Sequence, residues 1–159
     1  MRALLVDVHR EEILLIKALV PDTGNLLWFT PGGGKENDES DLDCLAREVC
    51  EETGYGQLLD PAQQVQLVWT RSEQFVFMGD DYHQDERYFW VPVERFEVQQ
   101  QALEAHEQDT FVAARWWSLD AITVSDEAFV PADLGAQVRH LLEAHRSGRL
   151  PRNVLHVGR

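Results

Sequence analysis

The segment REVCEETGY, residues 47–55, places three glutamates close together: Glu48, Glu51 and Glu52. On a helix these side chains are neighbours, because residues three and four apart lie on the same face. Like charges at these spacings repel by roughly 0.2–0.5 kcal/mol per pair on an isolated helix. The chain already carries 28 acidic against 14 basic residues, so this cluster calls for a compensating cation.

The chemistry that suits three clustered carboxylates is coordination of a hard divalent cation, since Mg²⁺ and Mn²⁺ prefer oxygen ligands. The alternative is a solvated helix face. Two neighbouring features favour the metal site. Arg47 lies inside the cluster and can pair with Glu39, which would fix the preceding loop against the helix. That loop is PGGG, residues 31–34, where glycine permits sharp turns and close approach of the backbone to a ligand.

The element that must position these glutamates is a helix over residues 41–53. Ser40 or Asp41 is the candidate N-cap, and Gly54 is the expected C-terminal stop. The glutamates lie beside an apolar face that is expected to pack into the core, formed by Leu42, Leu45, Ala46, Val49 and Thr53.

The remaining pattern predicts a strand-rich chain with one further long helix. Strands are expected over residues 2–8, 12–20, 26–30, 65–78, 82–93 and 111–119, and a helix over residues 131–145. Residues 99–108 are polar and weakly helical, and the arginine-containing tail 146–159 is expected to be solvated and partly ordered. We find no repeat or linker, so residues 1–159 are predicted to form a single domain.

Composition narrows the classes of function. A net charge of −14 argues against binding a nucleic acid polymer, but a small phosphate-bearing ligand remains compatible if a divalent metal separates phosphates from carboxylates. The chain has neither an apolar run of about 20 residues nor a signal peptide, which predicts a cytoplasmic protein without membrane association. Cys44 and Cys50 are six residues apart on one expected helix, so both are expected to be free thiols.

The same residues resemble a known family motif. Gly33, Glu39 and the run from Arg47 to Tyr55 match the Nudix box, G-x5-E-x7-R-E-U-x-E-E-x-G-U, at every fixed position. Val49 fills the first hydrophobic slot, and the aromatic Tyr55 is a mild departure at the second. The resemblance implies an α/β/α sandwich around a mixed sheet, and hydrolysis of a nucleoside diphosphate linked to another group.

The resemblance also implies a role for each matching residue. Glu51 and Glu52 would be the principal Mg²⁺ ligands, and Glu48 either a third ligand or the base that activates water. The backbone carbonyl of Gly32 or Gly33 would add a ligand. Supporting roles fall to Glu39 and Arg47, and a further glutamate outside the box is expected at Glu107 or Glu104, for which a solvated loop is the alternative.

The substrate is expected to be a small nucleotide, with a nucleoside di- or triphosphate favoured and an oxidised nucleotide among the candidates. Markers of the ADP-ribose, diadenosine polyphosphate, coenzyme A and NADH subgroups are absent. Lys17, Arg71 and Arg87 are candidate phosphate contacts, although exposure on one side of a strand explains them equally well. Aromatic side chains could stack a base or simply fill the core: Trp28, Phe29, Phe75, Phe77, Trp116 and Trp117. We take Phe29 as the candidate contact.

Three further expectations concern the class of protein and its assembly. A non-catalytic Nudix-like module that binds a nucleotide or a protein partner is the main alternative to an enzyme, but such modules usually lose box glutamates. An isopentenyl-diphosphate isomerase would need a catalytic cysteine outside the box helix, whereas Cys44 and Cys50 both lie within it. Small Nudix enzymes often pair, so a homodimer is expected.

Overall fold

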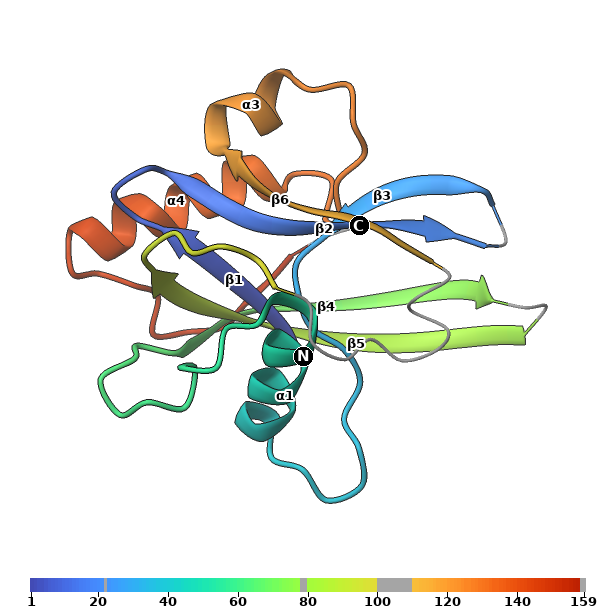
Figure 1. Cartoon of the computed structure of the whole chain (residues 1–159), viewed down its shortest axis with the longest axis horizontal. Coiled ribbons are helices and arrows are strands. Elements are labelled where there is room, and N and C mark those ends of the chain that lie inside the picture. Colours follow the sequence, from blue (N-terminus) through green and yellow to red (C-terminus); the bar gives the residue numbers. More distant parts are fainter. Residues whose placement is uncertain (22, 78–79, 100–109, 158–159) are drawn as a thin grey trace.

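A computed structural model describes residues 1–21, 23–77, 80–99 and 110–157 of the chain. Its elements follow one another along the sequence as shown in Figure 1. They are β1 (Arg2–Asp7), β2 (Glu12–Val20), β3 (Asn25–Phe29), α1 (Asp41–Thr53), β4 (Gln66–Phe77), β5 (Asp80–Val93), β6 (Phe111–Ser118), α3 (Leu119–Val124), α4 (Leu134–Arg146) and β7 (Leu155–His156).

The strands form one mixed sheet in the order β3-β2-β1-β5-β4-β7, with β6 paired to β2. β1 runs parallel to β5 along its whole length, from Arg2 opposite Tyr88 to Asp7 opposite Val93. β1 meets β2 only at its far end, after which β2 pairs with β3 and β6 instead. The sheet therefore divides beyond this point, and β2, β3 and β6 lie above β4 and β5 in Figure 1.

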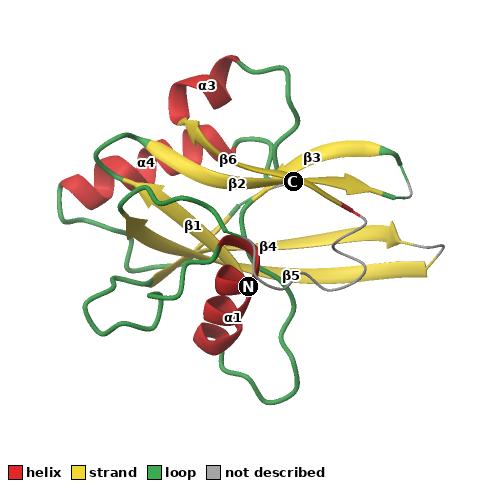
Figure 2. Ribbon diagram, in the orientation of Figure 1, coloured by secondary structure: helices red, strands yellow, loops and turns green. Residues whose placement is uncertain are grey.

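The core has two parts, one on each face of β1, because successive side chains of a strand point to opposite faces. Ala3 and Leu5 pack with Leu45 and Val49 of α1. Leu4 and Val6 belong to the second cluster, which contains apolar residues of α3 and α4: Leu119, Ile122, Leu134, Val138, Leu141 and Leu142. Helices thus cover both faces of the sheet (Figure 2), and the predicted α/β/α arrangement is confirmed.

Two segments of the structure differ in detail from the elements predicted from the sequence. The last long helix begins at Leu134 rather than at Pro131, because residues 131–134 form a turn in which the Leu134 amide donates to the Pro131 carbonyl at 3.0 Å. The tail is partly built into the sheet, since β7 pairs with β4 and the Val157 amide donates to the Thr70 carbonyl at 2.9 Å. In the described ranges, no helix is long and apolar enough to cross a bilayer.

Candidate active site

Helix α1 is delimited at both ends by local sequence. Ser40 is the N-cap: its hydroxyl accepts a 3.1 Å hydrogen bond from the amide of Asp43, which satisfies one of the unpaired donors of the first turn. Gly54 ends the helix at φ 78°, a left-handed conformation that glycine adopts without strain, and its amide donates to the Cys50 carbonyl. The predicted limits of this helix are confirmed.

The buried face of α1 is rotated relative to the predicted one. Leu42 is 41% exposed, so its assignment to the core was wrong, whereas Glu48 is only 6% exposed. The reason is that α1 contacts the glycine-rich loop as well as the sheet. Cys44, also buried, directs its thiol to the carbonyl of Gly34 at 3.3 Å. Because the side of α1 that carries Cys44 and Glu48 faces inward, Glu48 lies beneath the glycine-rich loop.

The glycine-rich loop is fixed against the beginning of β1. The Ala3 amide donates to the Pro31 carbonyl at 2.7 Å, and the terminal amino group of Met1 donates to the Gly33 carbonyl at 2.5 Å. Gly32 has φ 133°, and a Cβ at this position would lie 2.1 Å from the Met1 carbonyl oxygen. Only glycine can therefore occupy position 32 in this arrangement.

Two glutamates of α1 meet consecutive glycines of this loop. The amide of Gly32 donates a 2.6 Å hydrogen bond to Oε2 of Glu52. The carboxyl group of Glu48 lies so close to Gly33 that a Cβ there would be 2.5 Å from Oε1. The loop and the glutamate cluster thus form one site, although they are separated along the chain.

Arg47 joins the loop to the helix, as its position in the sequence predicts. Its Nε and Nη2 atoms donate to the two carboxylate oxygens of Glu39 at 2.8 and 3.1 Å, and Nη2 also donates to the Gly34 carbonyl at 3.1 Å. These hydrogen bonds from Arg47, with one from the Glu36 amide, lower the pKa of Glu39 to about 2. The Glu39 carboxylate is therefore charged across the physiological pH range.

Arg47 is also a cation within the glutamate cluster. Its Nη1 atom donates to Glu48 at 3.0 Å and to Glu51 at 3.3 Å, so one guanidinium holds both carboxylates. Hydrogen bonding to Glu39 and the charge of Glu48 raise the pKa of Arg47 above its ordinary value, although burial opposes this. As placed, no three acidic, histidine or cysteine side chains of the described part of the chain converge closely enough to hold a metal ion.

A cavity of about 660 Å³ opens beside this site. Glu52 and the loop residues Gly32, Gly33 and Gly34 lie at one side of it, with Lys35. The rest of the lining comes from β1, β2, β3, β5 and the start of β6, and includes Arg2, Ile16, Ala18, Phe29, Thr30, Gln84, Glu86 and Phe111. Its volume lies within the range of roughly 300–1,000 Å³ that is typical of small-molecule sites.

Comparison with known proteins identifies the family. The model of the NUDIX domain matches residues 1–138 of the chain. The chain belongs to the NUDIX family. Nucleotide pyrophosphohydrolase activity, which is hydrolysis of pyrophosphate bonds in nucleotide derivatives, is the activity that membership of this family supports.

Three individual proteins to which the chain is similar share 21–40% of its residues in the aligned regions. A stretch of 53 residues is 40% identical to mRNA decapping complex subunit 2 of Schizosaccharomyces pombe, covering 33% of this chain and 7% of that much longer protein. The NUDIX domain of Shewanella oneidensis NrtR, solved with ADP ribose, has a TM-score of 0.63 at 21% identity, covering 87% of this chain and 84% of that one. The E. coli ORF135 protein has a TM-score of 0.50 at 25% identity, with coverages of 95% and 89%.

The candidate phosphate-binding cations pair with carboxylates other than the three Nudix glutamates. Lys17 contacts both carboxylate oxygens of Glu127, at 2.8 and 3.0 Å. Arg71 pairs with Glu86 and Glu73, and Arg87 pairs with Asp41 at the start of α1. Of the four predicted substrate contacts, only Phe29 lines the 660 Å³ cavity. Glu104 and Glu107 lie outside the described residues.

Sequence reasoning missed a buried polar group in this cavity. Arg2 and Glu86 both line it and form an ion pair at 2.9 Å, with the Glu86 side chain only 6% exposed. The signal available in the sequence was weak: Arg2 begins one expected strand, and Glu86 is a charged residue within another. A charge in a strand is normally interpreted as facing solvent, and only the pairing of distant strands reveals otherwise.

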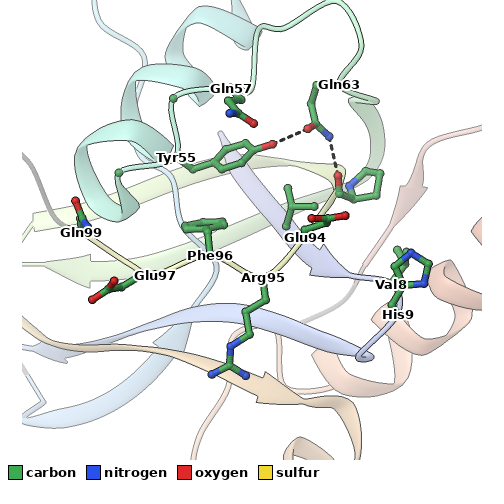
Figure 3. Close-up of a pocket in the computed structure, with 14 residues that line it drawn as sticks. Val8, His9, Tyr55, Gln57, Gln63, Glu94, Arg95, Phe96, Glu97 and Gln99 are labelled. Carbon is green, nitrogen blue, oxygen red and sulfur yellow. Dashed lines mark hydrogen bonds between the residues drawn. The ribbon is translucent and has the colours of Figure 1, made fainter.

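A second cavity, of about 720 Å³, is lined by residues that follow the C-terminal end of α1, among them Gly54, Tyr55 and Gln57 (Figure 3). Tyr55 stacks on Phe96 with ring centroids 5.0 Å apart. The Tyr55 hydroxyl donates to Gln63 at 2.6 Å, and Gln63 in turn donates to the Pro92 carbonyl at 2.7 Å. None of the three Nudix glutamates is among its described lining residues, whereas Glu52 lines the 660 Å³ cavity, which is therefore the candidate active site.

Proposed function

We propose that this Nudix enzyme uses Mg²⁺ or Mn²⁺ to hydrolyse the pyrophosphate bond of a nucleoside di- or triphosphate, oxidised nucleotides included. The observation that carries the proposal is the hydrogen bond from the Gly32 amide to Glu52, which sets a metal-binding type of side chain at the wall of a nucleotide-sized cavity. Among the described residues that line this cavity, Glu52 is the one carboxylate that accepts a hydrogen bond from the glycine-rich loop.

The donor set suits a hard divalent cation. Glu48, Glu51 and Glu52 supply carboxylate oxygens, and the carbonyl of Gly32 or Gly33 supplies a backbone oxygen, all of the type that Mg²⁺ and Mn²⁺ prefer. Glu51 and Glu52 would be the principal ligands. When bound, the metal would neutralise phosphate charge and lower the pKa of bound water.

Three further residues of the Nudix box, Glu48, Arg47 and Glu39, are proposed to assist catalysis. Glu48, beside Gly33 and largely buried, is proposed as a third ligand or as the base that takes a proton from the attacking water. Arg47 and Glu39 are proposed as positioning residues, because their bidentate pair joins the loop to the helix at 2.8 and 3.1 Å. A shift in either partner would move the carboxylates relative to the substrate.

The cavity supports a nucleotide as the substrate. Ile16, Ala18, Phe29 and Phe111 provide an apolar wall against which a base can lie, while Lys35 and the glycine loop suit the phosphate end. ADP ribose, the ligand bound to the structurally similar Shewanella oneidensis domain, is a nucleoside diphosphate derivative. The proposed location is the cytoplasm, and the partners are a small nucleotide and a second copy of the chain.

The test is a phosphate-release screen over nucleoside triphosphates, nucleoside diphosphates, ADP-ribose and dinucleotides with Mg²⁺ and with Mn²⁺. We expect turnover of at least one nucleotide, an alkaline optimum because water must be deprotonated near a metal, and complete loss of activity in excess EDTA. A rate that EDTA does not change would contradict the metal mechanism. No turnover of any substrate would favour a nucleotide- or partner-binding module instead.

A further inference from the structure

The carboxylate of Glu86 is the centre of a buried polar network. Oε1 accepts hydrogen bonds from Arg2 Nε at 2.9 Å and Gln84 Nε2 at 3.1 Å, and Oε2 accepts from Arg71 at 2.9 Å and the Tyr88 hydroxyl at 2.7 Å. Burial alone would raise the pKa of Glu86, but the charge of Arg2 and these hydrogen bonds outweigh it and leave that pKa below its ordinary value. The Glu86 carboxylate is therefore charged at neutral pH.

Arg2 connects this network to the glycine-rich loop. While its Nε donates to Glu86, its Nη1 donates to the carbonyl of Gly32 at 2.8 Å and to that of Thr30 at 3.4 Å. The parallel pairing of β1 and β5 fixes this geometry, because it places Arg2 opposite Tyr88, two residues after Glu86. Glu86 thus orients the guanidinium, and the guanidinium holds the loop.

The same glycine contacts the proposed metal site. The Gly32 carbonyl is held by Arg2, and the Gly32 amide donates to Glu52 at 2.6 Å. These two groups belong to the two successive peptide planes that flank the Gly32 Cα, so both planes are fixed. A continuous chain of short polar contacts therefore runs from Glu86 through Arg2 and Gly32 to Glu52.

We propose that Arg2 and Glu86 are positioning residues that set the Gly32 peptide and, through it, the carboxylate of Glu52. This inference rests on the proposed function of Glu52 as a metal ligand. Neither residue belongs to the Nudix box. Partners of this kind that orient metal ligands typically affect metal affinity or activity by about 10–100-fold when they are changed.

The chain offers a matched control for this pair. Arg146 also joins a glutamate to a backbone carbonyl, donating to Glu11 at 2.7 Å and to the Val8 carbonyl at 2.8 Å. It lies on α4, away from the Nudix glutamates. Arg2→Lys and Arg146→Lys both keep the positive charge and remove the planar fork, since lysine cannot bridge two acceptors in the same geometry.

The experiment compares native protein, Arg2→Lys and Arg146→Lys in three measurements: Mn²⁺ affinity of the metal-free protein by electron paramagnetic resonance, kcat and KM on a substrate from the screen, and Tm without metal. For Arg2→Lys we expect Mn²⁺ affinity and kcat to fall by about 10–100-fold with KM nearly unchanged. Arg146→Lys should match native protein in Mn²⁺ affinity and kcat. A purely structural role would lower Tm without this selective loss.

A second variant covers the case in which Arg2→Lys does not fold. Glu86→Asp keeps the anion but withdraws it by one methylene group, and should give the same loss of Mn²⁺ affinity. If both variants fold, the double variant should lose little more than either single variant, because they act along one path. Native Mn²⁺ affinity and kcat in a folded Arg2→Lys or Glu86→Asp would overturn the inference. Absence of Mn²⁺ binding and turnover in the native protein would instead overturn the proposed function.

Discussion

Glu52, in the last turn of α1, accepts a 2.6 Å hydrogen bond from the amide of Gly32, twenty residues earlier in the chain. The bond joins the helix that carries the Nudix glutamates to the loop that borders the cavity. It also gives the Glu52 carboxylate a fixed direction. The effect of the charge of Glu52 and the effect of the conformation of the glycine-rich loop can therefore be tested with separate substitutions.

The first prediction concerns the charge of Glu52. Glu52→Gln keeps the volume of the side chain and an oxygen that can accept from Gly32, but it removes one negative charge. We expect turnover at saturating Mg²⁺ to fall by at least about two orders of magnitude, because a positioned metal contributes several kcal/mol of transition-state stabilisation. Metal-free Tm should hold or rise slightly, since repulsion from Glu48 is relieved.

Thermal melts with and without Mg²⁺ complete this test. A metal that binds only the folded state stabilises it by mass action, so Mg²⁺ should raise the Tm of native protein more than that of Glu52→Gln. Glu143→Gln, the same change on an exposed face of α4, should behave like native protein in both assays. Equal turnover in Glu52→Gln and native protein would contradict the assignment.

The second prediction concerns the space beside Gly33. In Gly33→Ala, the new methyl group would lie 2.5–2.7 Å from atoms of the Glu48 carboxyl group, which must move aside. Because that group ends a flexible side chain, we expect the fold to persist while kcat falls by about 10–100-fold. Gly34→Ala is the control, since nothing lies within 4 Å of its added Cβ. Similar kcat values for the two variants would show that the position of Glu48 does not matter.

The third prediction concerns acid stability through Asp7. This carboxylate is fully buried and accepts hydrogen bonds from the amides of His9, Arg10 and Arg95 and from the Arg10 side chain. Burial would raise its pKa, but the amides of Arg10 and Arg95 and the Arg10 side chain outweigh it and lower the pKa from 3.8 to about 2. Its contribution is therefore complete above about pH 4 and is lost as the pH falls towards 2.

We expect this contribution to be on the order of 2 kcal/mol of unfolding free energy. Asp7→Asn should be less stable than native protein at neutral pH, and the difference should narrow between about pH 4 and pH 2. Denaturant titrations at several pH values measure it. Asp120→Asn, at a side chain that is 92% exposed, should show no such narrowing. A constant difference for Asp7→Asn would refute the assignment.

The fourth prediction concerns self-association. Leu19 and Leu26 are cross-strand partners on β2 and β3, and they are 37% and 42% exposed. β3 lies at one end of the strand order, so a second copy could cover this pair. We expect sedimentation velocity to give a homodimer at micromolar concentration and Leu26→Glu to weaken it. A native monomer at that concentration would end the proposal.

The sequence alone determined the local parts of this molecule. The limits of α1 follow from Ser40 and Gly54, whose effects act within one turn, and the strands follow from alternating apolar runs. The Nudix box was recognisable because its fixed residues lie within residues 33–55 of the chain. The pairing of Arg47 with Glu39 could be anticipated for the same reason, since the helix and its preceding loop bring them together.

The tertiary structure decided what depends on residues far apart in the chain. Helical periodicity placed Leu42 inside and could not foresee that α1 would turn Glu48 under the glycine loop, because that orientation depends on how the loop is fixed to β1. The ion pair of Arg2 with Glu86 arises from the parallel pairing of β1 and β5, which no local pattern encodes. The cavity likewise exists only because β2 leaves β1 to pair with β3 and β6.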